Sequence, residues 1–319
     1  MALLSRKNTN RHGNRRGFLA YSFAFMTGDS WYYCRRYSPA VFAGARSIFM
    51  ANKELLETSC IKEASKRLGF AVRTFDAHGN FFSVKAGGRD LFFANRSGPW
   101  NSDSIFKIFR DKEFTHMVFG SSVRMPRSAG FADPFYVPPG QAESLAGKQE
   151  RRDAFSQIAE RMAGLFCFPF VIKMNAGLKG INVFLVKSEK EAIDALEKIF
   201  DCRFRTYDYV ALAQEYIKIK EEYRVVVFRK ELLLIYKKGS RAVVVKDEAE
   251  KKEIADFLKP VFEALDFDFG AFDVVRETSG GLCLLEANSR PSFRGLAKGA
   301  GREALVGMYS HILSLLKEG

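Results

Sequence analysis

The sequence predicts an α+β protein built in several layers, and three observations favour this class. Helical runs such as residues 54–69 place apolar side chains three and four positions apart and end at a glycine. Short apolar strands occur in pairs around tight turns, as at 269–275 and 282–286. A segment with three prolines and two glycines, residues 134–148, separates two halves that each contain both kinds of element.

The individual elements follow from the same patterns. Before the linker we expect helices at 54–69 and 102–119 and strands at 70–75, 80–84 and 90–94. After it we expect helices at 152–162, 188–200, 247–265 and 303–316. The expected strands of this half are 166–172, 209–216, 223–228, 232–236, 269–275 and 282–286. Ser188 and Glu191 form a capping box, which sets the start of one of these helices.

Composition excludes several classes of protein. The 319 residues are 47% apolar and 27% charged, which is typical of a globular chain and excludes a disordered one. No window reaches the roughly 18 to 20 apolar residues of a membrane-spanning helix, so no membrane partner is expected. Five cysteines without a CxxC pair, and only four histidines, do not support a structural zinc site. Reduced thiols fit a cytoplasmic protein.

Positive charge is concentrated at the N-terminus. The net charge is +13, and the first fifty residues hold eight basic residues and one acidic residue. We expect residues 1–16 to form a basic, flexible arm. Nucleic acid stays an alternative as a partner of this arm, although no nucleic-acid-binding module follows it. A solvated terminus is the simpler interpretation.

Arg15-Arg16 and the apolar run 18–26 resemble a twin-arginine export signal. The run is short, contains Tyr21 and Ser22, and ends without a clear cleavage site. We therefore expect a first buried strand here, with export as the alternative.

Two segments of the second half could hold a nucleotide. The strand 166–172 ends at Lys173, and the loop after it contains Gly177 and Gly180. An ammonium group and accessible backbone N–H groups can bind phosphate, although a hairpin with an exposed lysine explains the same pattern. Further on, the peptide groups of residues 214–217 could pair with an adenine edge and Glu222 with ribose hydroxyls. An ordinary strand is the alternative.

A third segment could hold a metal. Asp273 lies in one strand of a hairpin, and Glu286 and Asn288 end the other. Side by side, two carboxylates and an amide oxygen suit Mg²⁺, whereas two buried acids without a cation would repel each other. A fourth segment, Asp111-Lys112 after a helix, indicates nothing by itself.

In their order and spacing, the four segments resemble the ATP-grasp superfamily of carboxylate–amine ligases, over residues 102–316. The resemblance implies an ATP-grasp fold, two α/β subdomains clasping ATP, preceded by a small α/β domain. The expected boundaries are 17–101 for the small domain and 102–319 for the ATP-grasp domain. Its nucleotide-clasping subdomain would cover about 150–216, and its metal and substrate subdomain about 217–319.

The resemblance also assigns the site residues. Those expected to bind ATP are Lys112, Lys173, Gly177, Gly180, Gln214, Glu215, Tyr216, Ile217 and Glu222. The expected ligands of two Mg²⁺ ions, with Mn²⁺ as an alternative, are Asp273, Glu286 and Asn288. The expected catalytic residues, which steady phosphate and the substrate carboxylate, are Arg224, Lys237 and Arg290. For Arg290, a surface salt bridge is the alternative.

The implied reaction activates a carboxylate as an acyl phosphate and joins it to an amine, giving ADP and phosphate. A nucleotide-binding regulator or scaffold without turnover is the alternative, and a homo-oligomer stays open. No subfamily matches fully: Ala271 replaces the arginine of D-alanine–D-alanine ligases, and Asn182 replaces a glycine of ribosomal-protein glutamate ligases. Six cations beside the motifs favour an acidic amino acid or peptide as substrate. They are Lys237, Lys238, Arg241, Arg290, Arg294 and Lys298.

Overall fold

The computed structural model describes residues 22–27, 30–35, 54–137, 147–177, 180–203 and 207–318. The chain divides into two compact units, one of Met1–Ala51 with Val137–Glu143 and one of Asn52–Tyr136 with Ser144–Gly319. Residues 52–101 belong to the same unit as the elements that follow them, and the expected boundary between a small domain and an ATP-grasp domain at residue 101 stays a prediction. The basic arm, residues 1–16, lies outside the described residues.

The described part of the first unit is an antiparallel hairpin. It consists of β1 (Ser22–Thr27) and β2 (Ser30–Arg35), with Ser22 opposite Arg35. Strand β1 covers part of the run 18–26, in which a buried strand was expected.

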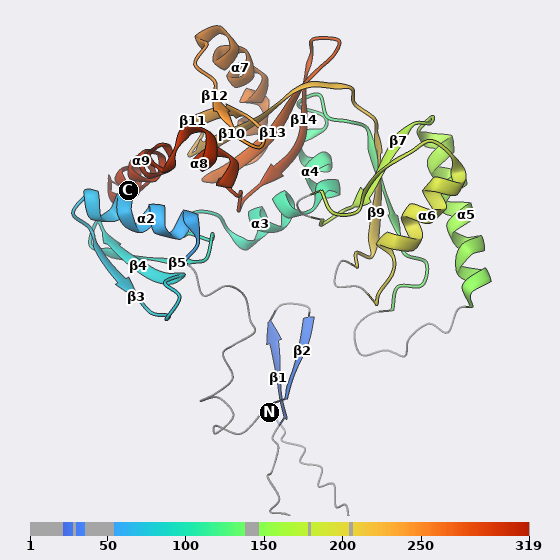
Figure 1. The fold of residues 1–319 in the computed structure, drawn as a ribbon, viewed down its shortest axis with the longest axis horizontal. Coiled ribbons are helices and arrows are strands. Elements are labelled where there is room, and N and C mark those ends of the chain that lie inside the picture. The colour runs from blue at the N-terminus through green and yellow to red at the C-terminus, as the bar shows by residue number, and fades with distance from the viewer. Residues whose placement is uncertain are drawn as a thin grey trace, which may run out of the picture. The chain divides into compact units, whose positions relative to one another are not determined.

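The second unit begins with a small sheet under two helices (Figure 1). Strands β3 (Ala71–Thr74), β4 (Phe81–Ala86) and β5 (Arg89–Ala94) are antiparallel and adjacent in that order. Helix α2 (Leu56–Arg67) and the C-terminal helix α9 (Arg302–Glu318) pack with them, so residues far apart in sequence share one apolar core.

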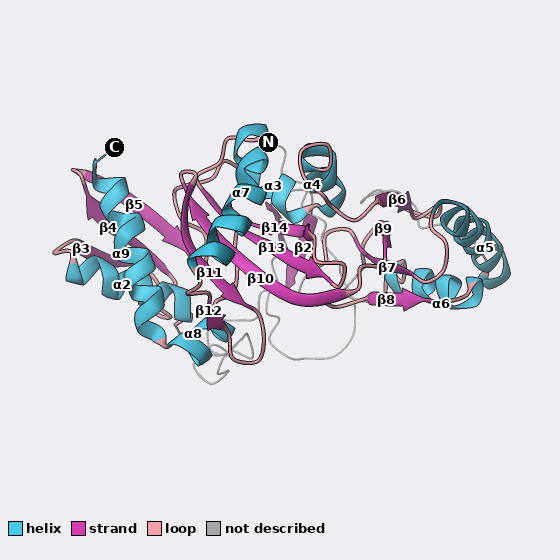
Figure 2. Cartoon of the chain, turned by 90° about the horizontal axis from the view of Figure 1, so that it is seen from above, coloured by secondary structure: helices cyan, strands magenta, loops and turns pink. Residues whose placement is uncertain are grey.

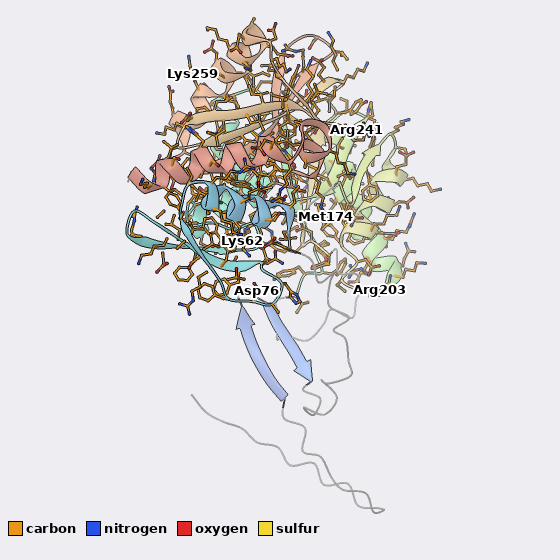
Figure 3. All side chains as sticks on the ribbon, turned by 60° about the vertical axis from the view of Figure 1, so that its left-hand side comes forward. Lys62, Asp76, Met174, Arg203, Arg241 and Lys259 are labelled. Carbon is orange, nitrogen blue, oxygen red and sulfur yellow. The ribbon has the colours of Figure 1, made fainter. Side chains whose placement is uncertain are left out.

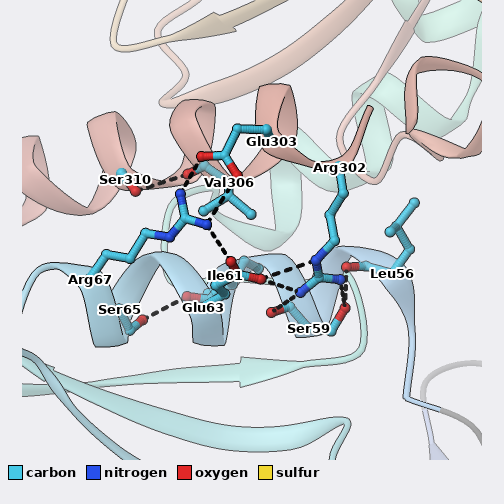
Figure 4. A network of polar contacts seen from close by, with 10 residues as sticks. All are labelled: Leu56, Ser59, Ile61, Glu63, Ser65, Arg67, Arg302, Glu303, Val306 and Ser310. Carbon is cyan, nitrogen blue, oxygen red and sulfur yellow. Dashed lines mark hydrogen bonds and ion pairs between the residues drawn. The ribbon is translucent and has the colours of Figure 1, made fainter. Parts of the chain in front are cut away.

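Polar contacts join these two helices across the surface (Figure 4). The Arg302 guanidinium donates to Glu63 Oε2 at 2.7 Å and to Ser59 Oγ at 2.7 Å. Arg67 bridges Glu63 and Glu303. Exposed ion pairs contribute little stability each, so the buried apolar residues beneath them hold the helices together.

The central sheet has five antiparallel strands in the order β12-β11-β10-β13-β14. Their bounds are Val243–Val244, Glu231–Lys237, Ile219–Phe228, Phe269–Glu277 and Leu282–Asn288. One face packs with α8 (Arg294–Ala300), α9 and the small sheet. The other face packs with α3 (Asp103–Arg110), α4 (Lys112–Phe119) and α7 (Glu248–Ala264), in a second core rich in phenylalanine.

The remaining sheet has four antiparallel strands in the order β6-β9-β7-β8, and helices α5 (Lys148–Leu165) and α6 (Glu189–Ile199) pack with it (Figure 2). The strand bounds are Ser128–Ala132, Val210–Glu215, Phe170–Met174 and Val183–Val186. Ser188 Oγ accepts from the Glu191 N–H at 3.3 Å, which is one half of the expected capping box, whereas Glu191 Oε2 accepts from the Lys187 N–H at 2.8 Å rather than from that of Ser188.

The expectation of one helix over 102–119 is wrong. Asp111 is extended, with φ −90° and ψ 116°, and it separates α3 from α4. Its Oδ1 accepts from the Phe114 N–H at 2.9 Å, so Asp111 is the N-cap of the second helix. The break places Lys112 in the first turn of α4, where it can reach β7.

Helix α8 was not expected from the sequence, and the strand expected at 166–172 begins only at Phe170. No helix among the described residues is long and apolar enough to cross a membrane.

Candidate functional site

A cavity of about 570 Å³ lies at the meeting of the central sheet with the four-stranded sheet. This volume falls within the range of ~300–1,000 Å³ that is usual for small-molecule sites. Fourteen of the fifteen expected site residues line it. They are Lys112, Lys173, Gly177, Gly180, Gln214, Glu215, Tyr216, Ile217, Glu222, Arg224, Asp273, Glu286, Asn288 and Arg290.

Lys112 enters the cavity from the first turn of α4. Its ammonium group donates to the carbonyl oxygens of Asn175 at 3.1 Å and Gly177 at 2.7 Å. Asn175 is buried and connects the loop after β7 to the start of α4. Its amide donates to Asp111 Oδ2 at 2.7 Å, and its side-chain oxygen accepts from the Glu113 N–H at 2.9 Å. Burial lowers the pKa of Lys112, and the charge of Glu286 opposes this change.

Lys173 comes from β7, and only 8% of it is exposed. Its ammonium group donates to Gln214 Oε1 at 2.8 Å, and no carboxylate among the described residues pairs with it. Burial lowers the pKa of Lys173 to about 8, and the neighbouring Lys112 charge acts in the same direction. A buried ammonium group with only a neutral acceptor is prepared to receive an anion.

The loop after β7 requires glycine at both expected positions. A Cβ on Gly177 would lie 2.7 Å from the Cβ of Met174, which is labelled in Figure 3. Gly180 has a φ of +69°, in the left-handed region. Lys179, in the same loop, lies outside the described residues.

The segment after β9 presents its peptide groups to the cavity. Tyr216 and Ile217 make no hydrogen bond to the backbone of any other described residue, so their N–H and C=O groups are available to a ligand. The side chain of Glu215 is engaged elsewhere, in a two-point contact with the Arg124 guanidinium at 2.9 and 3.0 Å. Arg124 lowers the pKa of Glu215 through these bonds. The Glu215 N–H also donates to the Arg127 carbonyl at 2.9 Å, so the peptide groups available to a ligand in this segment are those of Tyr216 and Ile217.

The three expected metal ligands lie on β13 and β14. Asp273 is directly opposite Glu286, and Asn288 is opposite Ala271. The Asn288 amide donates to Glu286 Oε1 at 3.2 Å, so these two side chains point to one place. The hairpin thus brings two carboxylates and an amide together at the cavity wall.

Asp273 is 1% exposed and carries two cationic partners. Arg224, opposite it on β10, donates to both carboxylate oxygens at 2.7 and 2.8 Å, and the Lys238 ammonium lies 2.8 Å from Oδ2. Burial alone would raise the pKa of Asp273, but Arg224 and Lys238 lower it. Lys238 also contacts Glu222, the residue expected to bind ribose.

Lys237 is the one expected residue that does not reach the cavity. Successive side chains of a strand point to opposite faces, and Lys237 is opposite Tyr223 rather than Arg224. Its ammonium contacts Glu221 at 2.7 Å and Glu250 of α7 at 3.2 Å, on the far face of the sheet. Lys238, expected only as one of the surrounding cations, lies at the cavity in its place.

Of the other cations expected around the site, only Arg290 lines the cavity. Its guanidinium stacks on the Phe106 ring at 3.8 Å from the centroid, and no acidic residue among those described forms an ion pair with it. Arg241, Arg294 and Lys298 are exposed and lie outside the cavity lining. The cavity also includes Arg96, from the turn after β5, which no motif in the sequence indicates.

The donor set of Asp273, Glu286 and Asn288 fits Mg²⁺, which prefers oxygen ligands and shares its coordination with water and phosphate. The described residues contain no group of three or more His, Cys, Asp and Glu side chains arranged to bind a metal without such help. Because Asp273 is bonded to Arg224 and Lys238, a cation at this carboxylate would have to share it with them.

A second hollow of about 980 Å³ lies beside α5 and α6. It contains both acidic and basic side chains and none of the expected site residues. Its lining residue Arg203 lies apart from Met174 of the first cavity in Figure 3. The smaller cavity, where lysines and carboxylates converge, is therefore the candidate site.

Comparison of folds finds several solved structures similar to this one. D-alanine–D-alanine ligase from Bacillus anthracis matches at 19% identity and a TM-score of 0.48, over 66% of this chain and 69% of that chain. A RimK-domain ATP-grasp protein from Sphaerobacter thermophilus matches at 17% identity and 0.45, over 64% and 67%. N5-carboxyaminoimidazole ribonucleotide synthetase from Thermotoga maritima matches at 18% and 0.42, over 61% of this chain but only 46% of that chain.

A search of curated proteins finds no significant match to the sequence. The family that describes the RimK-like ATP-grasp domain matches residues 140–312. This range includes both strands that hold Asp273 and Glu286, the buried Lys173, and the segment at Gln214. Because it covers more than half of the chain, the protein belongs to the family of RimK-like ATP-grasp domains.

Proposed function

We propose that this protein is an ATP-dependent ligase that joins a carboxylate to an amine through an acyl phosphate. The observation that carries the proposal is the cavity lined both by two lysines, the buried Lys173 and the half-buried Lys112, and by the carboxylates of Asp273 and Glu286. The lysines suit a triphosphate, and the carboxylates suit the cation that accompanies it.

Each part of the lining then has a role in binding ATP. The free peptide groups of Tyr216 and Ile217 would hold the adenine edge, and apolar side chains such as Val183 and Leu285 would cover its faces. Lys112 and Lys173 would neutralise phosphate oxygens. Glu222 lines the same cavity as Tyr216 and would accept ribose hydroxyls once Lys238 releases it.

In the proposed reaction, a substrate carboxylate oxygen attacks the γ-phosphorus of ATP and the bond to the β-phosphate oxygen breaks, releasing ADP. The amine then attacks the acyl carbon, loses a proton, and displaces inorganic phosphate. Arg224 would steady the transferred phosphoryl group from its position beside Asp273, and Arg290 would orient the carboxylate. Mg²⁺ held by Asp273, Glu286 and Asn288, with Mn²⁺ as a substitute, would neutralise the phosphate charge. Because the reaction consumes ATP, we infer that it takes place in the cytoplasm.

A second candidate is a nucleotide-binding regulator without turnover. The ion pairs of Asp273 with Arg224 and Lys238 favour it, because they leave that carboxylate without a free oxygen.

One experiment separates the two candidates. The protein is incubated with MgATP, hydroxylamine as a general amine, and a panel of amino acids and peptides, and hydroxamate and phosphate are measured. A ligase gives both products in equal amounts, and only with a suitable carboxylate. A regulator binds the nonhydrolysable analogue AMPPNP but gives neither product with any carboxylate.

A further inference from the structure

Arg96 lines the cavity although it comes from the small N-terminal sheet and lies outside every motif that identifies the site. It follows β5 in a tight turn in which Ala94 pairs with Ser97 and Asn95 has a φ of +55°. Asparagine tolerates this left-handed conformation better than most residues. The buried Thr58 hydroxyl donates to the Asn95 carbonyl at 3.1 Å, which fixes the turn to α2.

A buried acid holds the Arg96 side chain from one side. Glu57 is 1% exposed, and its Oε2 lies 3.3 Å from Arg96 Nε. Nε is itself buried and makes no hydrogen bond, so the contact is ionic and poorly aligned. This ion pair positions the guanidinium through Nε, and the two terminal nitrogens make no hydrogen bond to Glu57.

The same acid connects Arg96 to the metal-binding end of the cavity. Glu57 Oε1 accepts from the Phe293 N–H at 3.0 Å, and the preceding Ser292 carbonyl accepts from Arg224 at 3.4 Å. Arg224 in turn holds Asp273. Arg96 therefore lies beside the segment that follows Glu286 and Asn288.

The partners of the cavity cations separate them into groups. Arg224 and Lys238 are neutralised by carboxylates, and Lys112 and Lys173 donate to neutral oxygens on the nucleotide side. The terminal nitrogens of Arg96 donate to no acceptor among the residues that the structure describes. Arg96 is paired with Glu57 through Nε alone, so its terminal nitrogens, like the guanidinium of Arg290 over Phe106, remain in the cavity to bind an anion other than the triphosphate.

We infer that Arg96 binds a carboxylate of the substrate that does not react, and that Glu57 is the residue that positions it. This inference rests on the proposed ligase function and names a specificity-determining residue of the same site. The substrate class is an amino acid or peptide with at least one carboxylate besides the groups that form the new bond. A planar guanidinium with two free nitrogens matches a carboxylate at two points, which a lysine cannot do.

The test crosses an enzyme variant with a substrate variant. Arg96→Gln is compared with the wild type in the hydroxamate assay, using dicarboxylates such as L-glutamate and each of its two monoamides. If Arg96 contacts the non-reacting carboxylate, Arg96→Gln raises the KM for the dicarboxylate at least about tenfold. It leaves the KM for the monoamide that lacks this carboxylate within about twofold. A general disturbance of the fold would raise both values together.

Controls address folding and ATP. Arg89→Gln removes an exposed arginine of the same sheet and should change neither KM. The double variant Glu57→Gln with Arg96→Gln removes both charges, so that no buried carboxylate is left unpaired, and it should behave like Arg96→Gln. Arg96→Lys should recover only part of the affinity. A KM for MgATP that rises more than the KM for the dicarboxylate would assign Arg96 to a phosphate and overturn the inference.

Failure of the ligase function can be told apart from failure of this inference. If no carboxylate gives hydroxamate, the proposed function is wrong, and binding of tri-L-glutamate to the protein with MgAMPPNP is measured by calorimetry instead. Weaker binding by Arg96→Gln than by Arg89→Gln supports the anion site. Equal binding by both, or no binding by the wild type, overturns it, as does an unchanged preference for dicarboxylate over monoamide in the enzyme assay.

Discussion

Lys173 allows a test in which stability and nucleotide binding change in opposite directions. Its pKa of about 8 lies below the usual 10.5, so the folded protein disfavours the charged form. At 1.36 kcal/mol for each pH unit, the free-energy cost of keeping it charged is about 3 kcal/mol. The cost is fully present below pH 8 and disappears as the pH rises toward 10.5.

Lys173→Met removes this charge and keeps a side chain of similar length. It also leaves Gln214 Oε1 without its donor, which costs about 1 kcal/mol. At pH 7 we expect the nucleotide-free variant to be more stable than the wild type by about 2 kcal/mol, a few degrees in melting temperature. The difference should shrink between pH 7 and pH 10, because the wild type then loses its proton.

Binding of MgAMPPNP should show the opposite effect. Calorimetry at pH 7 should give an affinity at least about tenfold weaker for Lys173→Met, because a charge-assisted contact to phosphate is lost. From pH 7 to pH 9 the wild type should weaken by up to about tenfold as Lys173 deprotonates, and the variant should change less.

The matched control is Lys187→Met, which removes an exposed lysine at the end of β8 in the same subdomain and should alter neither property. The reasoning would be refuted if Lys173→Met melted at a lower temperature than the wild type at both pH 7 and pH 10. It would also be refuted if the variant bound MgAMPPNP with the same pH dependence as the wild type.

Three further predictions concern the other side of the cavity. Glu286→Gln should lower ATP-dependent phosphate release more than about 100-fold with a melting temperature close to that of the wild type, and near-normal turnover with Mg²⁺ would exclude this carboxylate from the metal site. Lys238→Met should reduce turnover while Lys237→Met leaves it unchanged, and kinetics that reverse this order would contradict the strand alternation. Arg290→Ala should raise the KM for an acidic substrate about tenfold and that for ATP much less, and a loss confined to ATP binding would assign Arg290 to the nucleotide.

Much of the fold was predictable because its signals are local. Alternation and turn residues predicted the hairpin of β13 and β14, and helical spacing predicted α2, α6, α7 and α9. The break between α3 and α4 was missed, although its signal was present: Asp111 is a good N-cap residue in the middle of an apolar helical pattern. The helical spacing of apolar residues continues across the break, so periodicity alone predicts one continuous helix.

At the candidate site, the sequence does not predict which of two neighbouring side chains faces the cavity. Lys237 and Lys238 are adjacent, and a motif of charged residues cannot tell which one faces a ligand. Once the strand register is known, the alternation of side chains along a strand shows which lysine faces the cavity. Arg224 is opposite Tyr236, so Tyr236 and Lys238 lie on the same face of the sheet as Arg224, and Lys237 lies on the other. That register depends on a bulge between Val226 and Val227, which the sequence does not mark.

Arg96 could not be found from the sequence for a different reason. Its position depends on Glu57, which reaches Phe293 across 236 residues, and on a turn whose only local sign is one asparagine. Burying Glu57 is unfavourable unless both of its oxygens are occupied, and Phe293 and Arg96 occupy one each. The small sheet is thereby tied to the segment that follows the carboxylates of β14. Removing Arg96 therefore leaves the buried Glu57 carboxylate with a single partner, which can also destabilise the fold. For this reason the role of Arg96 in binding is separated from its role in folding by changing the substrate together with the enzyme.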